Sequence, residues 1–388
     1  MLKNPPKITS ALAAGALLFT VVSCTPPADN ASAETVESSS SSASAAGSSS
    51  ERTKPAPAAG WSERLIDAPY KPEDLVETSS GAVIVSAMAE NPGESGSSGS
   101  LYYMDPDTTE ISPAWPSQSV ASELDAELFG ECSGPLGEEE TSPHGITVES
   151  ADDGAERLYV VNHGGRESIE VFDVLDDGGQ PGLTWIGCVE LPEGSFGNGV
   201  AADPNSDGFF VTHFLNPADM ENEFQRAFAG EDTGHVLHWT PESGWTQLPQ
   251  STMSTPNGIA VSEDGESLYV ASWGGRKLVE LDPSSGAVLR ETPVDIMPDN
   301  LRFTDSGAVL VTGQVIDSFD TFVGYEFGGV QPEDRYDILE LDPESFTTTV
   351  FAEGSVAGFG NPTTALPVGE KVFVGAVAGT HILELSQR

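Results

Sequence analysis

The sequence predicts an all-β protein, a six-bladed β-propeller that follows a targeting segment and a flexible tether. Three observations predict it. Short apolar strands separated by Gly, Asp, Pro and Ser run from about residue 61 to the end, a strand–turn–strand unit recurs, and no amphipathic stretch is both long and well capped. The 41 glycines and 28 prolines among 388 residues suit tight turns better than long helices.

Residues 1–23 are expected to be a lipoprotein signal peptide and are left out of the fold. Lys3 and Lys7 give a positive start, and Ile8 to Ser23 is apolar or small, but too short and too weakly hydrophobic for a membrane span. The ending Val21-Val22-Ser23-Cys24 resembles a bacterial lipobox, which implies a lipid on Cys24. An ordinary secretory signal cleaved at a nearby small residue is the alternative.

Residues 24–60 are rich in Ser, Ala and Pro and are expected to be a flexible tether between the anchor and a propeller of residues 61–388. This arrangement places the protein in a bacterial cell envelope, facing the periplasm or the exterior, with membrane contact only through the lipid. Lipidation of Cys24 leaves Cys132 and Cys188, which in an oxidising envelope either pair or remain separate buried thiols.

The charge balance excludes one class of partner. Sixteen Lys and Arg stand against 61 Asp and Glu, giving a formal net charge of -45. Such a field repels phosphate backbones, so no nucleic-acid binding is expected.

A repeated unit defines the blades. One copy begins at Asn257-Gly258 and turns at Asp264-Gly265, and an earlier copy begins at His144-Gly145 and turns at Asp153-Gly154. Asp-Gly between alternating strands is a strong hairpin signal, so each unit is expected to be one small antiparallel sheet.

Counting the starts of innermost strands gives six blades. These starts are Glu73/Asp74, His144, Asn198, Asn257, Asp299/Asn300 and Thr363/Thr364. A seventh blade would have to lie within residues 101–142. Two insertions interrupt the pattern, an expected short amphipathic helix within 216–232 and an aromatic loop at 319–327. Either insertion covers a pocket or packs on the propeller's own surface.

The polar residues at these starts predict a metal site. All inner strands of a propeller begin on the same face, so their first side chains point into one axial cluster. Two carboxylates and three amides make an oxygen cage suited to calcium, and less suited to zinc or copper. The cage residues are Glu73, Asn198, Asn257, Asp299 and Asn300. Asn-Gly is also common turn chemistry, but its recurrence at equivalent places favours the metal.

At these residues the chain resembles a known family. The segments Pro143-His144-Gly145-Ile146, Val160-Val161-Asn162-His163, Pro256-Asn257-Gly258-Ile259 and Asp299-Asn300 are similar, in order, to the serum paraoxonase/arylesterase family. Glu73-Asp74 falls where that family has an acidic pair. The resemblance covers roughly residues 70–388. It is weaker to gluconolactonase and strictosidine-synthase-like propellers, which lack the histidine pair.

The resemblance implies roles for these residues. Glu73, Asn198, Asn257, Asp299 and Asn300 would bind a catalytic calcium, with His144 as general base and His163 as its partner in a dyad. Asp74 and the carbonyl of Ile146 would serve a second, structural calcium. This chain departs from the family at Gly199, where the family has an aspartate, which puts the second calcium in doubt.

The expected function is a calcium-dependent hydrolase of lactones or aryl esters, a carboxylic-ester hydrolase with a small-molecule substrate. Calcium polarises a carbonyl, and an imidazole that titrates near neutrality takes a proton from water. The alternative is a non-catalytic, surface-anchored propeller that binds a protein or glycan, with His144 and His163 as structural residues satisfied by backbone. Ionisable groups inside the channel favour the enzyme.

Overall fold

The computed structural model describes residues 60–94, 96–116, 120–150, 156–175, 181–326, 329 and 331–388. The chain divides at Arg52/Thr53, and all described residues belong to the unit Thr53–Arg388. The expected signal peptide, the tether with Cys24 and the turn at Asp153-Gly154 lie outside the described residues.

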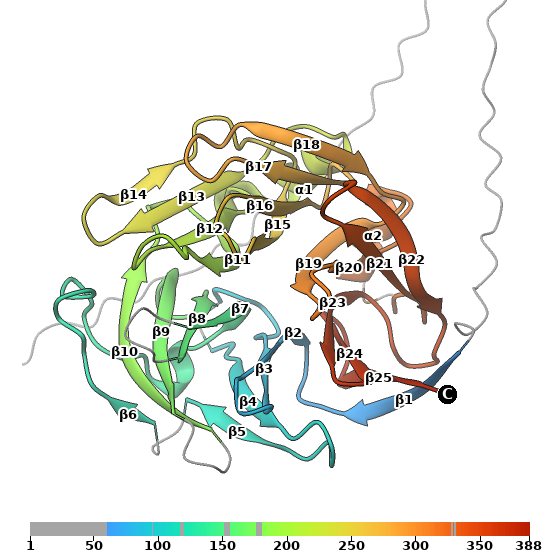
Figure 1. Cartoon of the computed structure of the whole chain (residues 1–388), viewed down its shortest axis with the longest axis horizontal. Helices are drawn as coiled ribbons and strands as arrows, with labels where there is room; N and C mark the ends of the chain where they lie inside the picture. The colour runs from blue at the N-terminus through green and yellow to red at the C-terminus, as the bar shows by residue number, and fades with distance from the viewer. Residues whose placement is uncertain are drawn as a thin grey trace, which may run out of the picture. The chain divides into compact units, whose positions relative to one another are not determined.

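Within these ranges the strands form six sheets arranged around one centre, which confirms the six-bladed β-propeller (Figure 1). Blade 1 contains β2 (Pro72–Glu77), β3 (Val83–Ala87), β4 (Ser100–Met104) and β5 (Ile111–Trp115); blade 2 contains β7 (Pro143–Ser150), β8 (Glu156–Asn162), β9 (Ser168–Leu175), β10 (Gly182–Glu190) and the short β6 (Ala121–Ser122); blade 3 contains β11 (Gly197–Ala202), β12 (Phe209–His213), β13 (His235–Thr240) and β14 (Gly244–Gln247). Blade 4 contains β15 (Pro256–Val261), β16 (Leu268–Ser272), β17 (Lys277–Leu281) and β18 (Val288–Pro293); blade 5 contains β19 (Met297–Phe303), β20 (Val309–Gln314), β21 (Tyr336–Asp342) and β22 (Thr347–Gly354); blade 6 contains β23 (Pro362–Val368), β24 (Lys371–Ala376), β25 (His381–Gln387) and β1 (Trp61–Asp67).

The first and last strands close the ring. β1 pairs antiparallel with β25, from Trp61 opposite Gln387 to Asp67 opposite His381. Residues 101–142, where a seventh blade would have to lie, supply the outer strands of blade 1 and the short strand β6. β6 pairs in parallel with β10 of blade 2. The described residues therefore contain six blades and no seventh.

Every inner strand carries a β-bulge near its start. The pairing register shifts between Pro72 and Asp74 in β2, and equivalent shifts occur in β7, β11, β15, β19 and β23. The residues skipped by these shifts are Glu73, His144-Gly145, Asn198-Gly199, Asn257-Gly258, Asp299-Asn300 and Thr363-Thr364. A bulge leaves such residues outside the ladder and re-aims their side chains. The predicted cluster therefore comes from one β-bulge that is repeated in all six inner strands.

The glycines in three bulges reflect close backbone approach. A Cβ on Gly145 would lie 2.2 Å from the carbonyl oxygen of Asn198, and one on Gly258 would lie 2.5 Å from that of Asp299. Gly199 meets the carbonyl oxygen of Asn257 in the same way, at 2.8 Å. None of the three has a positive φ. The recurring Asn-Gly therefore does not mark tight turns, because each glycine admits the backbone of the next blade's bulge.

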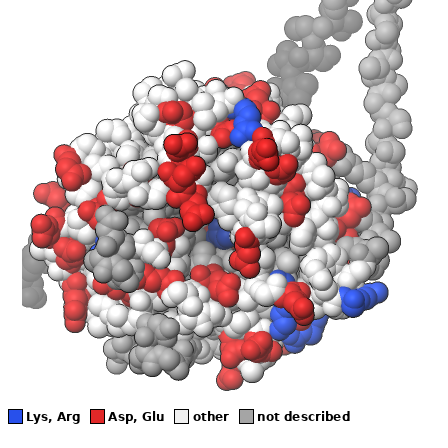
Figure 2. Space-filling model, in the orientation of Figure 1, with Lys and Arg blue, Asp and Glu red and all other residues white. Residues whose placement is uncertain are grey.

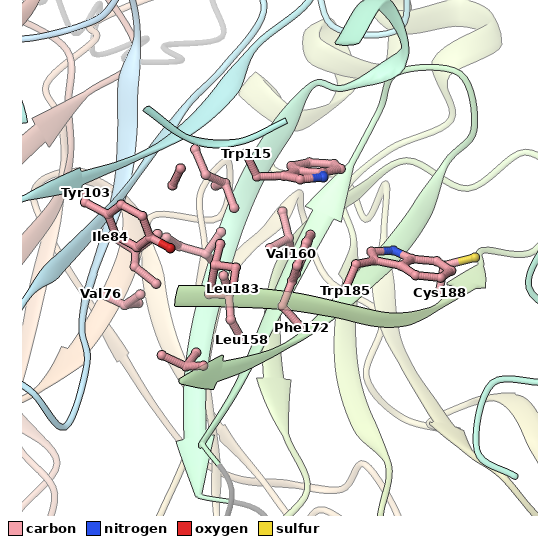
Figure 3. Close-up of a cluster of buried hydrophobic side chains, with 14 residues drawn as sticks. Val76, Ile84, Tyr103, Trp115, Leu158, Val160, Phe172, Leu183, Trp185 and Cys188 are labelled. Atoms are coloured by element: carbon pink, nitrogen blue, oxygen red, sulfur yellow. The ribbon is translucent and has the colours of Figure 1, made fainter. Parts of the chain in front are cut away.

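Neighbouring blades are joined by apolar side chains. Figure 3 shows one such cluster, which contains Val76 and Ile84 of blade 1 together with Val160 and Phe172 of blade 2. Full burial of side chains of this size contributes roughly 1.5–3 kcal/mol each. These contacts hold the blades, and thus the ring of bulges, in place.

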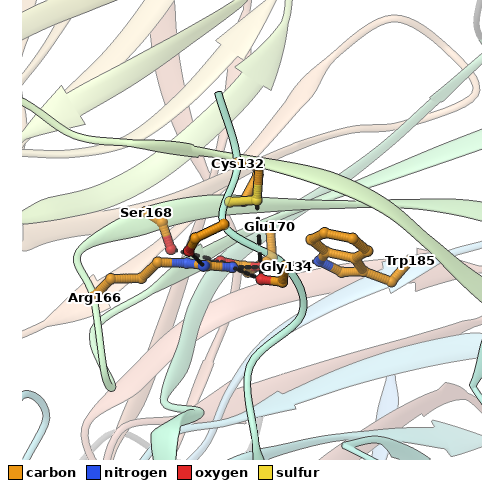
Figure 4. The surroundings of a disulfide bond; sticks show 8 residues. Cys132, Gly134, Arg166, Ser168, Glu170 and Trp185 are labelled. Carbon is orange, nitrogen blue, oxygen red and sulfur yellow. Dashed lines mark hydrogen bonds and ion pairs between the residues drawn. A yellow bond between two sulfur atoms is a disulfide. The ribbon is translucent and has the colours of Figure 1, made fainter. Parts of the chain in front are cut away.

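The two cysteines outside the signal are paired. Cys132 and Cys188 form a disulfide with a Cα–Cα distance of 5.3 Å, which decides between a pair and two separate thiols. Beside it, Glu170 is fully buried and accepts hydrogen bonds from Arg166, Ser168 and Trp185 (Figure 4). The bridge ties the segment between β6 and β7 to β10 of the same blade.

The insertions contain helices. The predicted helix is present as η2 (Pro217–Asp219) and α1 (Met220–Phe228), while the predicted aromatic loop contains α2 (Phe319–Glu326); η1 (Glu138–Glu140) precedes β7. α1 and α2 pack together, with the ring centroids of Phe224 and Phe322 4.6 Å apart. None of the helices in the described ranges is long and apolar enough to cross a membrane.

Candidate active site

The predicted cage residues meet in the channel as buried side chains. Their relative exposures are Glu73 1%, Asn198 4%, Asn257 4%, Asp299 5% and Asn300 3%. Four buried oxygens of this cluster accept no hydrogen bond from any described residue: Glu73 Oε2, Asn198 Oδ1, Asn257 Oδ1 and Asp299 Oδ1. Such oxygens normally have partners, because an unpaired buried polar atom costs about 1–3 kcal/mol. Their grouping fits a hard cation.

Amide oxygens are essential to this cluster. The described residues contain no group of three or more His, Cys, Asp or Glu placed to hold a metal. The predicted cage contains two carboxylates among the described residues, Glu73 and Asp299, so a cation here would depend on Asn198 and Asn257 as well. Calcium accepts such mixed oxygen ligands.

Both carboxylates of the cage resist ionisation. Burial, together with the nearby Asp74 and Asp299 charges, raises the pKa of Glu73 well above its usual value. Burial raises the pKa of Asp299 to about 8, despite a hydrogen bond from Gln314. A bound cation would remove this penalty, since opposite charge favours the ionised form.

Neighbouring amides orient these carboxylates. Asn300 Nδ2 donates to Glu73 Oε1 at 2.8 Å, and Gln314 Nε2 donates to Asp299 Oδ2 at 2.7 Å. Gln314 also accepts from the indole of Trp273 at 2.7 Å. The sequence reasoning missed Gln314, whose only signal was its place at the end of β20. Asn300 lies where predicted but uses its amide nitrogen to support Glu73.

The two predicted histidines form a hydrogen-bonded pair. His144 Nδ1 lies 2.8 Å from His163 Nε2. Asn162 fixes the loop that carries His163, because its side chain accepts from Ser142 N and donates to the Gly164 carbonyl. Phe196 stacks on His163 with ring centroids 4.1 Å apart and an interplanar angle of 4°.

A carboxylate extends the pair to three members. Both oxygens of Glu167 lie 2.9 Å from His163 Nδ1, and Glu167 Oε1 also accepts from Gly197 N at 2.7 Å. The carboxylate can only accept, so His163 carries its proton on Nδ1 and receives one from His144 Nδ1. The Nε2 of His144 is then unprotonated. Glu167 was missed from sequence, although its spacing of four residues after His163 was visible.

His144 stands beside the cage in its neutral form. Its Nε2 lies 3.9 Å from Glu73 Oε1. Burial, with smaller contributions from His163 and Lys71, lowers its pKa well below the usual value. An unprotonated nitrogen next to an oxygen cluster is the arrangement that a general base beside a metal requires.

The second predicted calcium site is filled by the protein itself. The Asp74 carboxylate accepts hydrogen bonds from Leu75 N, Ile146 N and the guanidinium of Arg302. The same guanidinium donates to the Ile146 carbonyl at 3.1 Å. Asp74 and Ile146 therefore come together as expected, but they surround an arginine and do not fit a further metal.

A cavity of about 1170 Å³ opens above the cage and the histidines. One wall is apolar, made by side chains of α1, α2 and neighbouring loops: Phe214, Leu215, Met220, Phe224, Trp273, Ile316, Phe322 and Tyr325. Both inserted helices thus border the site. Other parts are lined by acidic side chains and by Lys71, whose pKa is lowered by burial. Acidic side chains also far outnumber basic ones on the face shown in Figure 2.

Fold and site together define a β-propeller with a histidine dyad beside an axial oxygen cluster. The arylesterase family profile matches residues 72–318, more than half of the chain, and the chain belongs to that family. Comparison with curated protein sequences finds no match.

Solved structures resemble the chain only distantly. A luciferin-regenerating enzyme is 12% identical, with 84% of this chain and 95% of that chain covered and a TM-score of 0.52. A regucalcin described as a calcium-binding protein from Agrobacterium tumefaciens is 13% identical (84% and 96% covered, TM-score 0.48). A catalytically inactive virginiamycin B lyase from Staphylococcus aureus is 14% identical (84% and 100% covered, TM-score 0.46). The first of these supports the fold, and none assigns a function.

Proposed function

We propose that this protein is a calcium-dependent hydrolase of lactones or aryl esters. The observation that carries the proposal is the juxtaposition of four unpartnered buried oxygens with the unprotonated Nε2 of His144. Membership of the arylesterase family supports ester substrates.

Glu73, Asn198, Asn257 and Asp299 would hold the calcium through their free oxygens, with Asn300 as the fifth ligand proposed from the resemblance. When bound, calcium would polarise the carbonyl of the ester or lactone and stabilise negative charge on its oxygen. Gln314 holds Asp299 in place, and the apolar wall would shield the apolar part of the substrate from water.

His144 would supply the base. Its Nε2 takes a proton from the water that attacks the carbonyl carbon, and its Nδ1 proton stays on the hydrogen bond to His163. The positive charge on His144 is stabilised through His163 by the Glu167 carboxylate. His144 then returns the proton to the leaving alkoxide, so that ester and water give a carboxylic acid and an alcohol.

The test is a panel of lactones and aryl esters, assayed with the calcium-depleted protein and again after calcium is restored. Turnover that disappears on depletion and returns with calcium supports the proposal. Full turnover after depletion would show that the metal has no catalytic part. The absence of turnover on every substrate, with calcium bound, would favour the non-catalytic binding propeller.

We also propose that the mature chain is anchored to a bacterial membrane through a lipid on Cys24, on the strength of the lipobox-like ending of the signal. Mass spectrometry of the native N-terminus tests this. An unmodified terminus that begins elsewhere contradicts it.

A further inference from the structure

Arg302 occupies an unusual position for an arginine in this acidic chain. It follows the channel residues of β19, and its side chain is 15% exposed, while that of its partner Asp74 is 1% exposed. Its guanidinium donates to the Asp74 carboxylate, to the Leu75 carbonyl at 2.9 Å and to the Ile146 carbonyl at 3.1 Å. It also donates to the carbonyl of Leu301 at 2.8 Å.

Without Arg302, these oxygen acceptors would need another cation as their partner. One is a carboxylate oxygen and the others are backbone carbonyls, and they come from the inner strands β2, β7 and β19. Carboxylate and carbonyl oxygens are also typical calcium ligands. The arginine thus joins three blades from within the ring, in the manner of a bound ion.

The charge of the site matches an arginine better than a metal. Asp74 is the only carboxylate among these acceptors, so a single positive charge balances it. A second carboxylate at position 199 has no room, because a Cβ there would lie 2.8 Å from the carbonyl oxygen of Asn257 and 3.1 Å from Ile259 N. A divalent ion in this place would keep an uncompensated charge.

We propose that the Arg302 guanidinium replaces a second bound cation, so that the chain binds one calcium ion and supplies its own cation beside the cage. The count of one rests on the proposed function above, whereas the role of Arg302 rests on its own contacts. A guanidinium presents five donors in a rigid plane and never loses its charge at working pH. Unlike an ion, it cannot dissociate when calcium is scarce.

The first measurement is the calcium content of the unaltered full-length protein, by calorimetric titration of the depleted protein. One equivalent is expected. Two equivalents overturn the proposal. No binding at all contradicts the calcium site of the proposed function, and the role of Arg302 is then decided by the variants alone.

The second measurement compares melting temperatures in calcium and in chelator. Arg302→Ala leaves Asp74 buried without its partner, so its melting temperature in chelator should fall by roughly 4–8 °C. Calcium at millimolar concentration should raise the melting temperature of Arg302→Ala by more than it raises that of the parent protein. Arg302→Ala should then bind a second equivalent of calcium. Arg302→Lys keeps the charge but offers a compact ammonium, so it should lose less and bind no second ion.

Arg290→Ala is the matched control. Arg290 also contacts one carboxylate, that of Glu280, and two backbone carbonyls, those of Pro343 and Glu344, but it lies on the outer strand of blade 4. Its loss should be smaller and should show no added recovery in calcium. If Arg302→Ala responds to calcium no more than Arg290→Ala does, Arg302 is an ordinary ion-pair partner and the proposal fails. If Arg302→Ala does not fold, Arg302→Lys decides. The proposal then fails if Arg302→Lys binds a second equivalent of calcium, or if its loss of melting temperature is as small as that of Arg290→Ala.

Discussion

Two neighbouring residues of one strand, Glu73 and Asp74, meet opposite surroundings although both are 1% exposed. Glu73 belongs to an open cluster, with Asn198, Asn257 and Asp299, in which four oxygens have no partner. Asp74 belongs to a closed cluster, with Ile146 and Arg302, in which the carboxylate is hydrogen-bonded on both oxygens.

This difference in hydrogen bonding indicates which of the two clusters is suited to bind a ligand. Burying a carboxylate is costly unless an opposite charge or hydrogen bonds compensate it. The closed cluster is compensated by the chain's own hydrogen bonds and by Arg302. The open cluster is not, and its carboxylates have raised pKa values as a result. A site left incomplete next to a neutral histidine is suited to binding and catalysis.

The largest effect on turnover is expected from His144→Gln, which removes the proposed base and leaves both clusters intact. Turnover on a good lactone or aryl ester should fall by about 10²- to 10⁴-fold. Calcium affinity and melting temperature should stay close to those of the parent, which calorimetry and thermal melts would show. Near-normal turnover would mean that another group activates the water.

Neutralising one carboxylate in each cluster tests the comparison directly. Asp299→Asn should reduce turnover by roughly 10²- to 10³-fold, because calcium polarisation of the carbonyl is lost with the metal. Its melting temperature should no longer respond to calcium. Asp74→Asn leaves Arg302 without its charge partner and should cost about 3–5 kcal/mol of stability, with the calcium response kept. If calcium changes the melting temperature of both variants equally, the proposed distinction between the two clusters is wrong.

A smaller loss is expected from Glu167→Gln, which touches neither cluster. The amide can donate to His163 Nδ1 and so permit the wrong tautomer, and the positive charge on His144 loses its distant carboxylate. Supporting residues of this kind typically contribute 10- to 100-fold, and the loss should appear in kcat with KM little changed. Glu167→Asp is the control that keeps the charge and should recover part of kcat. A KM effect alone would assign Glu167 to substrate binding.

The sequence could predict the propeller, its six blades and the residues of the open cluster, because all of these follow from one repeated segment. His144 and His163 were also predictable, since both stand in segments resembling the arylesterases. Gln314 and Glu167 were not, because a lone Gln at a strand end, and a Glu four residues after a His in a chain with 61 acidic residues, are not distinctive. Arg302 could not be foreseen either, since its partners lie 156 and 228 residues away in the chain.

The smallest expected effect is a pH dependence confined to the open cluster. In the calcium-free protein the raised pKa of Asp299, about 8 against an ordinary value of 3.8, means that the folded state binds protons more tightly than the unfolded chain. Stability is therefore present below the ordinary value and is lost as pH rises toward 8. Bound calcium keeps the carboxylate ionised, so the melting temperature in calcium should not show this loss. The gap between the two melting curves should widen by a few degrees between pH 5 and pH 8, and Asp299→Asn should abolish the widening. A gap that narrows over the same range would mean that calcium binds elsewhere.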